Sequence, residues 1–349
     1  MLDSLGFVDA VRGLPEQLAA AHAAARDALA GAALPAATDL TSIAVLGMGG
    51  SGISGDVLAA AASHDLCLPV QVHKQLRTPA YIGPRTLVLA VSYSGDTEET
   101  VSMARGAIDA GAPVVAISSG GELARLATES GVLHLACPGG YMPRAAIGAL
   151  VAPILSTLGA IGLLTDTDAW LEAAVRQLGR RRDACAPEVD APANPAREIA
   201  RRIDGTIPLV YGGGALGAVA AMRWKCDINE NAKAPAFWAA YPELDHNEIC
   251  GWGQHGDVTR QVVSILELRH AHEHERLRRR IEVTRDIIAE AVHQVVPVEA
   301  EGEGRLAQLL DLMYLGDWVS VYLATERGID PGPIPAIATL KGILATPEG

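Results

Sequence analysis

The sequence predicts an α/β protein built on doubly wound parallel sheets, and three observations carry this prediction. Short apolar runs alternate with helix-like stretches, glycine clusters directly follow some of these runs, and the same pattern starts again in the second half of the chain. Continuous apolar runs of this length are typical of strands that are buried on both faces. In the first half the expected strands are residues 43–46, 69–73, 87–91, 114–117 and 132–136.

The remaining elements follow in chain order. Residues 7–33 read as an alanine-rich helix, and further helices are expected near 54–62, 97–110 and 122–129, with two more within 145–185. The Pro- and Ala-rich stretch 186–195 has no apolar period and is interpreted as a linker. The second half then gives strands at 207–211, 263–268 and 294–298 and helices ending near 226, at 276–293, at 306–326 and from Pro335. The predicted domains are therefore 1–185 and 196–349.

Composition excludes several classes of protein. Of 349 residues, 49% are hydrophobic, and the net charge of −13 disfavours nucleic acid and anionic membranes as partners, because such binding depends on positive charge. Five widely spaced cysteines without a C-x-x-C motif suit a reducing compartment better than a disulfide framework or a zinc site. No secretory signal or long apolar segment is recognised. A cytoplasmic protein is expected.

The first glycine cluster, Gly47-Met48-Gly49-Gly50-Ser51-Gly52, fits G-x-G-x-x-G and raises the question of a nucleotide cofactor. Dinucleotide binding also needs an acidic residue at the end of the second strand, to bind the ribose. Here that strand ends in His73-Lys74, and Asp65 lies before it. A nucleotide is therefore disfavoured, whereas a glycine turn needed only for strand–helix packing stays open.

A loop rich in hydroxyl groups follows the third expected strand, where a helix begins. Ser92, Ser94 and Thr97 lie within six residues, and Ser51 occupies the corresponding turn after the first strand. Helix N-termini carry unpaired N–H groups and partial positive charge, so they bind phosphate, and hydroxyls add donors. Simple capping by Ser94 or Asp96 is the alternative, but it explains only one of these residues. The predicted phosphate-binding set is Gly50, Ser51, Ser92, Ser94 and Thr97.

These motifs resemble a known family. V-S-Y-S-G-x-T-x-E-T after G-M-G-G-S-G resembles the sugar isomerase (SIS) domain, in which such a loop holds the phosphate of a sugar phosphate. Four further motifs, in order along the chain, extend the resemblance to the bifunctional phosphoglucose/phosphomannose isomerase family: Pro143-Arg144-Ala145, the N-E-N-A-K segment 229–233, His246-Asn247 and Leu340-Lys341. The resemblance covers nearly the whole chain and implies two SIS-type, flavodoxin-like domains.

The resemblance implies an aldose–ketose isomerase of hexose 6-phosphates without metal or redox cofactor. Glu230 would move a proton between C1 and C2 through a cis-enediol(ate), a task suited to a partly buried carboxylate. His246, assisted by Lys341, would open the sugar ring, and Arg144 would stabilise the enediolate charge. The family arrangement is a homodimer, with His246 reaching in from the other chain. Without the resemblance, the residue types of Glu230, His246, Lys341 and Arg144 would indicate only solvent-exposed or structural side chains.

One departure leaves substrate choice open. Family members often carry Thr-Pro where this chain has Ile334-Pro335, and the threonine is thought to help accept both C2 epimers, so acceptance of mannose 6-phosphate is in doubt. A non-catalytic sugar-phosphate-binding protein with a regulatory role and an isomerase of another phosphosugar are the alternatives. His270, His272 and His274 occupy every second position, so on a strand their side chains would point the same way and could bind a metal ion. No further ligand cluster lies nearby, and no metal is expected.

Overall fold

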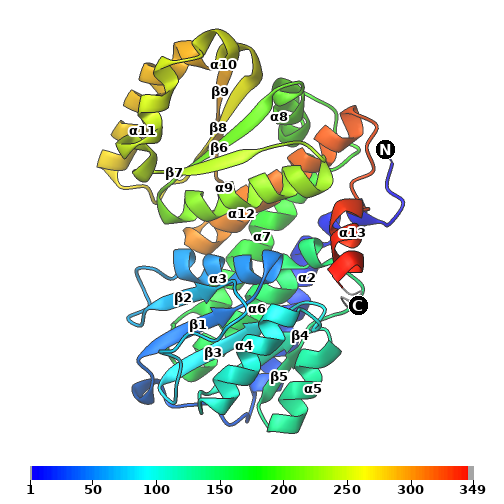
Figure 1. Cartoon of the computed structure of the whole chain (residues 1–349), viewed down its shortest axis with the longest axis vertical. Helices are drawn as coiled ribbons and strands as arrows, with labels where there is room; N and C mark the ends of the chain where they lie inside the picture. Colours follow the sequence, from blue (N-terminus) through cyan, green and yellow to red (C-terminus); the bar gives the residue numbers. More distant parts are fainter. Residues whose placement is uncertain (1, 345–349) are drawn as a thin grey trace. The chain divides into compact units, whose positions relative to one another are not determined.

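The computed structural model describes residues 2–344, which form two compact units, each with its own parallel sheet (Figure 1). The first unit contains residues 13–180 and 301–311. The second unit contains residues 2–12, 181–300 and 312–344. The division falls within two helices, α7 (Thr167–Cys185) and α12 (Gly304–Glu326).

The first unit holds a five-stranded sheet in the order β2-β1-β3-β4-β5. Its strands are β1 (Ser42–Leu46), β2 (Val70–His73), β3 (Thr86–Val91), β4 (Val114–Ser118) and β5 (Leu133–Ala136). All neighbouring strands are parallel, and Ile43 lies opposite Val70 on one side and Leu87 on the other. This order is that of a flavodoxin-like doubly wound sheet, so the predicted fold class is confirmed.

Helices cover the sheet because alternate strand residues point to opposite faces. Ala44, Val88 and Ala116 share one apolar core with Met103 and Leu126, which lie on α4 and α5. The helices and 3-10 turns of this unit are α2 (Leu14–Leu29), η1 (Ala37–Asp39), α3 (Gly49–Ala61), α4 (Glu98–Asp109), α5 (Gly121–Ser130), η2 (Pro143–Ala145), α6 (Ile147–Ile161) and the first part of α7.

The second unit holds a four-stranded parallel sheet in the order β7-β6-β8-β9. Its strands are β6 (Ile207–Gly213), β7 (Phe237–Tyr241), β8 (Val263–Arg269) and β9 (Gln294–Glu299). Its helices and 3-10 turns are α1 (Phe7–Arg12), α8 (Pro195–Ile203), α9 (Gly214–Asn231), η3 (Glu243–His246), η4 (Glu248–Gly253), α10 (Gly256–Val262), α11 (Glu275–Ile288), η5 (Ala289–Ala291), most of α12 and α13 (Pro335–Leu344). Among the helices of residues 2–344, none is long and apolar enough to cross a membrane.

Some elements differ from the sequence prediction. Strand β7 and helices α8 and α10 were not predicted, and α9 continues past residue 226 to Asn231, so Glu230 lies inside this helix rather than after it. Tertiary contacts hold the added turn, because the buried Asn231 side chain donates to Ser320 Oγ at 2.9 Å. The helix expected over 7–33 divides into α1 and α2 around Gly13.

The domain boundaries stay a prediction, although the linker region has a clear local structure. Helix α8 begins at Pro195, and the Asn194 side chain caps it by accepting from Arg197 N at 3.0 Å. Asn194 is itself fully buried. The predicted linker therefore ends in a helix cap, and no disulfide links any of the five cysteines, all of which lie in the described range.

Candidate functional site

The glycine turn after β1 is a tight strand–helix junction. A Cβ atom on Gly52 would lie 2.6 Å from the carbonyl oxygen of Gly47, and one on Gly47 would lie 2.9 Å from that of Val91. These distances are too short for any side chain, so the turn requires glycine. The close approach places the first turn of α3, with Gly50 and Ser51, beside the end of β3.

The hydroxyl loop after β3 meets this turn directly. Tyr93 N donates to Ser51 Oγ at 3.2 Å, so the two turns expected to be neighbours are in contact. Within the loop, Ser92 Oγ donates to Thr97 Oγ1 at 2.9 Å and accepts from Gly95 N at 3.1 Å. Ser92 is buried, Thr97 is partly exposed and Ser94 is exposed. The structure thus brings the predicted phosphate-binding residues together at one sheet edge, and their role stays a prediction.

Capping does not explain these hydroxyls. Thr97 is the N-cap residue of α4, yet no side-chain hydrogen bond caps this helix. Ser94 Oγ accepts from Asp96 N at 3.3 Å, and Asp96 Oδ1 accepts from Glu122 N at 2.9 Å, in the first turn of α5. Neither Ser94 nor Asp96 therefore caps α4, and the N–H groups at the N-terminus of a helix can bind an external acceptor.

Arg144 lies in the same unit, in the 3-10 turn η2, which packs against α3. The side chain is buried, with 6% of the residue exposed. A permanent cation in such a low-dielectric place interacts strongly with charge that develops nearby. Of the predicted catalytic residues, only Arg144 belongs to the unit that carries the hydroxyl loop.

Two further residues of this site were missed by the sequence reasoning. Tyr93 links the hydroxyl loop to the segment before Arg144, and the Thr100 hydroxyl in the first turn of α4 is buried with no hydrogen-bond partner among the described residues. Both lie inside the recognised loop motif, but their roles depend on contacts that the sequence does not display.

The predicted catalytic residues Glu230, His246 and Lys341 belong to the second unit. Glu230 is half-buried in the last turn of α9, His246 is exposed at the end of η3, and Lys341 is exposed on α13. The neighbouring Asp245 accepts from Thr284 Oγ1 at 2.7 Å, which fixes η3 against α11. Their catalytic roles stay predictions.

Lys233 ends helix α9 with a left-handed backbone, at φ +55°. Its ammonium donates to the carbonyl oxygens of Glu230 at 2.8 Å and Asn231 at 3.3 Å. It also donates to those of Asp330 at 3.0 Å and Pro331 at 3.2 Å. A lysine at this position satisfies carbonyl groups that the helix end leaves without partners.

A buried ionic cluster lies one turn before Glu230. Arg223 Nε lies 2.8 Å from Asp227 Oδ2, and Arg223 Nη2 lies 2.8 Å from Asp317 Oδ1 on α12. All three residues are buried. Burial first and the Asp317 carboxylate second raise the pKa of Asp227, against the opposing effect of Arg223.

The second glycine turn, after β6, has the spacing of the first. Gly212, Gly214 and Gly217 follow Gly47, Gly49 and Gly52 by 165 residues each. A Cβ atom on Gly212 would lie 2.1 Å from Gly217 O, and Gly214 has φ +60°, against +51° at Gly49. The backbone turn is thus repeated, whereas the buried Leu216 stands where the first turn has Ser51.

A carboxylate lies against this second turn. Glu273 Oε1 would be 2.6 Å from a Cβ atom on Gly213. The buried carboxylate accepts from Arg269 Nη2 at 2.7 Å and from His270 N at 3.2 Å. His270 Nε2 is hydrogen-bonded to Gly213 O at 2.8 Å, and the His274 side chain caps α11. His270 and His274 of the alternating run thus have structural contacts, and within residues 2–344 no cluster of three or more His, Cys, Asp or Glu side chains is arranged to hold a metal ion.

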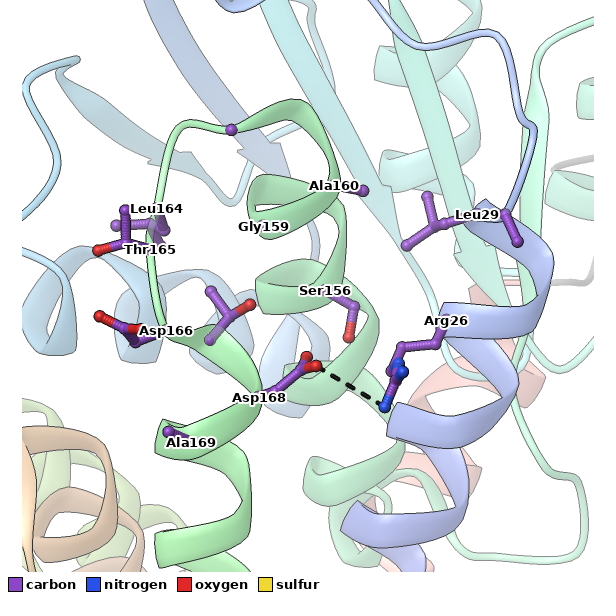
Figure 2. Close-up of a pocket in the computed structure, with 13 residues that line it drawn as sticks. Arg26, Leu29, Ser156, Gly159, Ala160, Leu164, Thr165, Asp166, Asp168 and Ala169 are labelled. Atoms are coloured by element: carbon purple, nitrogen blue, oxygen red, sulfur yellow. Dashed lines mark ion pairs between the residues drawn. The ribbon is translucent and has the colours of Figure 1, made fainter.

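A pocket of about 780 Å³ in the first unit lies between α2, α6 and α7 and contains none of the predicted residues (Figure 2). Arg26 and Asp168 form an ion pair across it at 3.7 Å. Asp168 also lies 3.3 Å from His22 Nε2, and His22 Nδ1 is hydrogen-bonded to Ser156 Oγ at 3.0 Å. Ser156 is buried in the middle of α6, so these groups tie three helices together rather than present a nucleophile.

Comparison with known proteins agrees with this architecture. Residues 192–344 match the family model described as the bacterial phospho-glucose isomerase C-terminal SIS domain. A putative phosphosugar isomerase from Clostridium difficile has a similar fold, with a TM-score of 0.71 at 13% identity over 93% of this chain and 94% of that one.

Two curated relatives are more similar in sequence, and both are named bifunctional phosphoglucose/phosphomannose isomerase. The protein of Caldicellulosiruptor bescii is 35% identical over 97% of this chain and 98% of its own length. That of Aquifex aeolicus is 36% identical over 87% of this chain and 92% of its own length. The chain therefore belongs to the bifunctional phosphoglucose/phosphomannose isomerase family.

Proposed function

We propose that this chain is an aldose–ketose isomerase that interconverts glucose 6-phosphate and fructose 6-phosphate. The observation that carries the proposal is the paired turns of the first unit, where Ser51 Oγ and Tyr93 N meet at 3.2 Å beside the uncapped N-terminus of α4. Such a site binds a phosphate monoester through hydroxyls and N–H groups. It needs little positive charge, which suits a chain of net charge −13.

The reaction then needs three operations on the sugar. His246, assisted by Lys341, opens the ring by moving a proton between the ring oxygen and the anomeric hydroxyl. Glu230 removes a proton from one of C1 and C2 and returns it to the other. Arg144 stabilises the negative oxygen of the cis-enediolate. A metal or redox cofactor has no step to perform in this sequence.

The test is a coupled assay on glucose, mannose, fructose and glucosamine 6-phosphates with wild-type protein and the variant Glu230→Gln. We expect the variant to lose about 10²- to 10⁴-fold in kcat and to keep its affinity for phosphosugar, because only the proton transfer is removed. Glu290→Gln, at an exposed position of η5, is the matched control. Near-normal turnover by folded Glu230→Gln would refute the base assignment.

The same assay separates the alternatives. No turnover by wild type, together with clear thermal stabilisation by a phosphosugar, would indicate a non-catalytic binding protein. Turnover of glucosamine 6-phosphate alone would indicate another phosphosugar isomerase. Mannose 6-phosphate is the second proposed substrate, and Ile334→Thr restores the hydroxyl that many family members have there. We expect this variant to raise turnover of mannose 6-phosphate relative to glucose 6-phosphate.

We further propose a cytoplasmic homodimer in which His246 acts in the partner's site, a role that its exposure allows. Mixing Glu230→Gln with His246→Ala chains tests this. A mixed dimer then holds one site with both residues intact, so about a quarter of wild-type activity returns at statistical mixing. If His246 acts within its own chain, every site is defective and no activity returns.

A further inference from the structure

Tyr93 lies inside the hydroxyl loop, and each of its polar groups bonds to a different turn at the sheet edge. Its N–H donates to Ser51 Oγ at 3.2 Å, in the turn after β1. Its carbonyl accepts from Ser119 N at 2.8 Å and from Ser119 Oγ at 2.7 Å, after β4. Its hydroxyl donates to Pro138 O at 3.0 Å and accepts from Tyr141 N at 2.9 Å, after β5.

The segment held by the Tyr93 hydroxyl leads directly to Arg144, three residues after Tyr141. A second anchor holds the far side of η2. Gln17 Nε2 donates to Ala145 O at 2.9 Å, and Gln17 Oε1 accepts from Ala149 N at 3.0 Å. The segments on both sides of Arg144 are thus held by buried side chains, and Tyr93 ties the preceding segment to the hydroxyl loop.

The Tyr93 hydroxyl is suited to this task. Tyr93 is only 5% exposed, and burial raises the pKa of its hydroxyl, which therefore stays protonated and donates at neutral pH. Its two partners are backbone groups of half-buried residues, and such groups are costly to leave without hydrogen bonds where they are shielded from water. Removal of this one oxygen would leave Tyr141 N and Pro138 O without the bonds that fix the segment.

We propose that Tyr93 is a positioning residue, whose hydroxyl holds the 138–142 segment, and through it Arg144, at a fixed distance from the phosphate-binding hydroxyls. This inference rests on the proposed function. The hydroxyl loop fixes the phosphate end of the substrate, whereas Arg144 acts at the enediolate near its other end. A misplaced Arg144 therefore weakens transition-state stabilisation and leaves phosphate binding intact.

The variant Tyr93→Phe removes only the hydroxyl. We expect kcat to fall by about 10- to 100-fold, with KM and the Kd for inorganic phosphate changed by less than about twofold. Tyr141→Phe is the matched control, because its ring lies beside that of Tyr93, with centroids 6.4 Å apart, while the hydrogen bond from Tyr141 uses its backbone N–H. This control should behave as wild type.

A double-variant cycle tests whether Tyr93 acts through Arg144. In the Arg144→Ala background, Tyr93→Phe should lower kcat no further. An equal loss in both backgrounds, or wild-type kcat in Tyr93→Phe, would overturn the inference.

Hydrogen exchange gives a readout that needs no turnover. Residues 138–146 should exchange faster in Tyr93→Phe and at the wild-type rate in Tyr141→Phe. Unchanged exchange in Tyr93→Phe would overturn the positioning role, whatever the activity. A wild-type protein inactive on every hexose 6-phosphate would instead overturn the proposed function alone, and the exchange rates would still decide whether Tyr93 holds this segment.

Discussion

The glycine turns after β1 and β6 share their glycine spacing but differ in what lies against them. The first turn presents Ser51 to the hydroxyl loop, whereas the second has the buried Leu216 and faces the carboxylate of Glu273. In the second unit a side chain of the protein thus supplies an anion close to the N-terminus of α9, where the helix dipole favours negative charge. The same backbone turn thus lies beside a proposed phosphate site in the first unit and beside an internal carboxylate in the second.

The largest effect should come from Arg269→Met, which removes the cation that holds Glu273. A buried carboxylate that loses its partner is strongly destabilised, so we expect a loss of about 3–5 kcal/mol in the free energy of unfolding, measured in urea. Arg278→Met is the control, because Arg278 Nε lies 4.0 Å from Glu273 but its side chain is 47% exposed. A loss below about 1 kcal/mol is expected for the control, and one this small for Arg269→Met would contradict the buried pair.

Glu273→Ala tests whether the second turn can accept an external anion once its own carboxylate is removed. The variant should be destabilised, and inorganic phosphate at about 100 times its Kd should restore about 2.7 kcal/mol of stability. Glu267→Ala is the control, since Glu267 is equally buried and also pairs with arginine, but it is not the carboxylate placed against a glycine turn. Equal rescue of both variants by phosphate would mean that the turn has no special affinity for anions.

At the first turn, by contrast, removal of a side-chain group should weaken the binding of a phosphorylated ligand. Ser51→Ala and Thr97→Val should each weaken phosphosugar binding about tenfold, because each removes one donor worth about 1.4 kcal/mol, and kcat should change little. Calorimetry with glucose 6-phosphate measures the affinity. Ser102→Ala, which removes an exposed hydroxyl from α4, should bind as wild type. Unchanged affinity in both site variants would remove this loop from phosphate binding.

The last effect appears only when pH is varied, and it concerns the buried cluster before Glu230. Because the folded pKa of Asp227 is raised above its unfolded value, its contribution to stability is greatest below about pH 4 and is lost as pH rises through the folded pKa. Asp227→Asn has no proton to lose there, so its stability relative to wild type should improve as pH rises from 4 to 8. A difference that does not change with pH would show that Asp227 is ionised throughout.

Local patterns predicted the sheets and the glycine turns well, because apolar runs and glycine spacing appear directly in the sequence. Strand β7 was missed, although Phe237–Tyr241 is a continuous apolar run of the kind that predicted the other strands. The length of α9, the contacts of Tyr93 and the approach of Glu273 to Gly213 depend on residues more than 25 positions away in the chain. Such contacts are created by the tertiary fold and leave no periodic signal.

The N-E-N-A-K segment 229–233 combines a proposed catalytic residue with a structural anchor. Its glutamate is the proposed base, while Lys233 joins the end of α9 to Asp330 and Pro331, just before the helix that bears Lys341. Protein engineers who vary this segment to change sugar preference would therefore also alter the anchoring of a distant part of the chain. A library that keeps Lys233 fixed would separate changes in chemistry from changes in architecture.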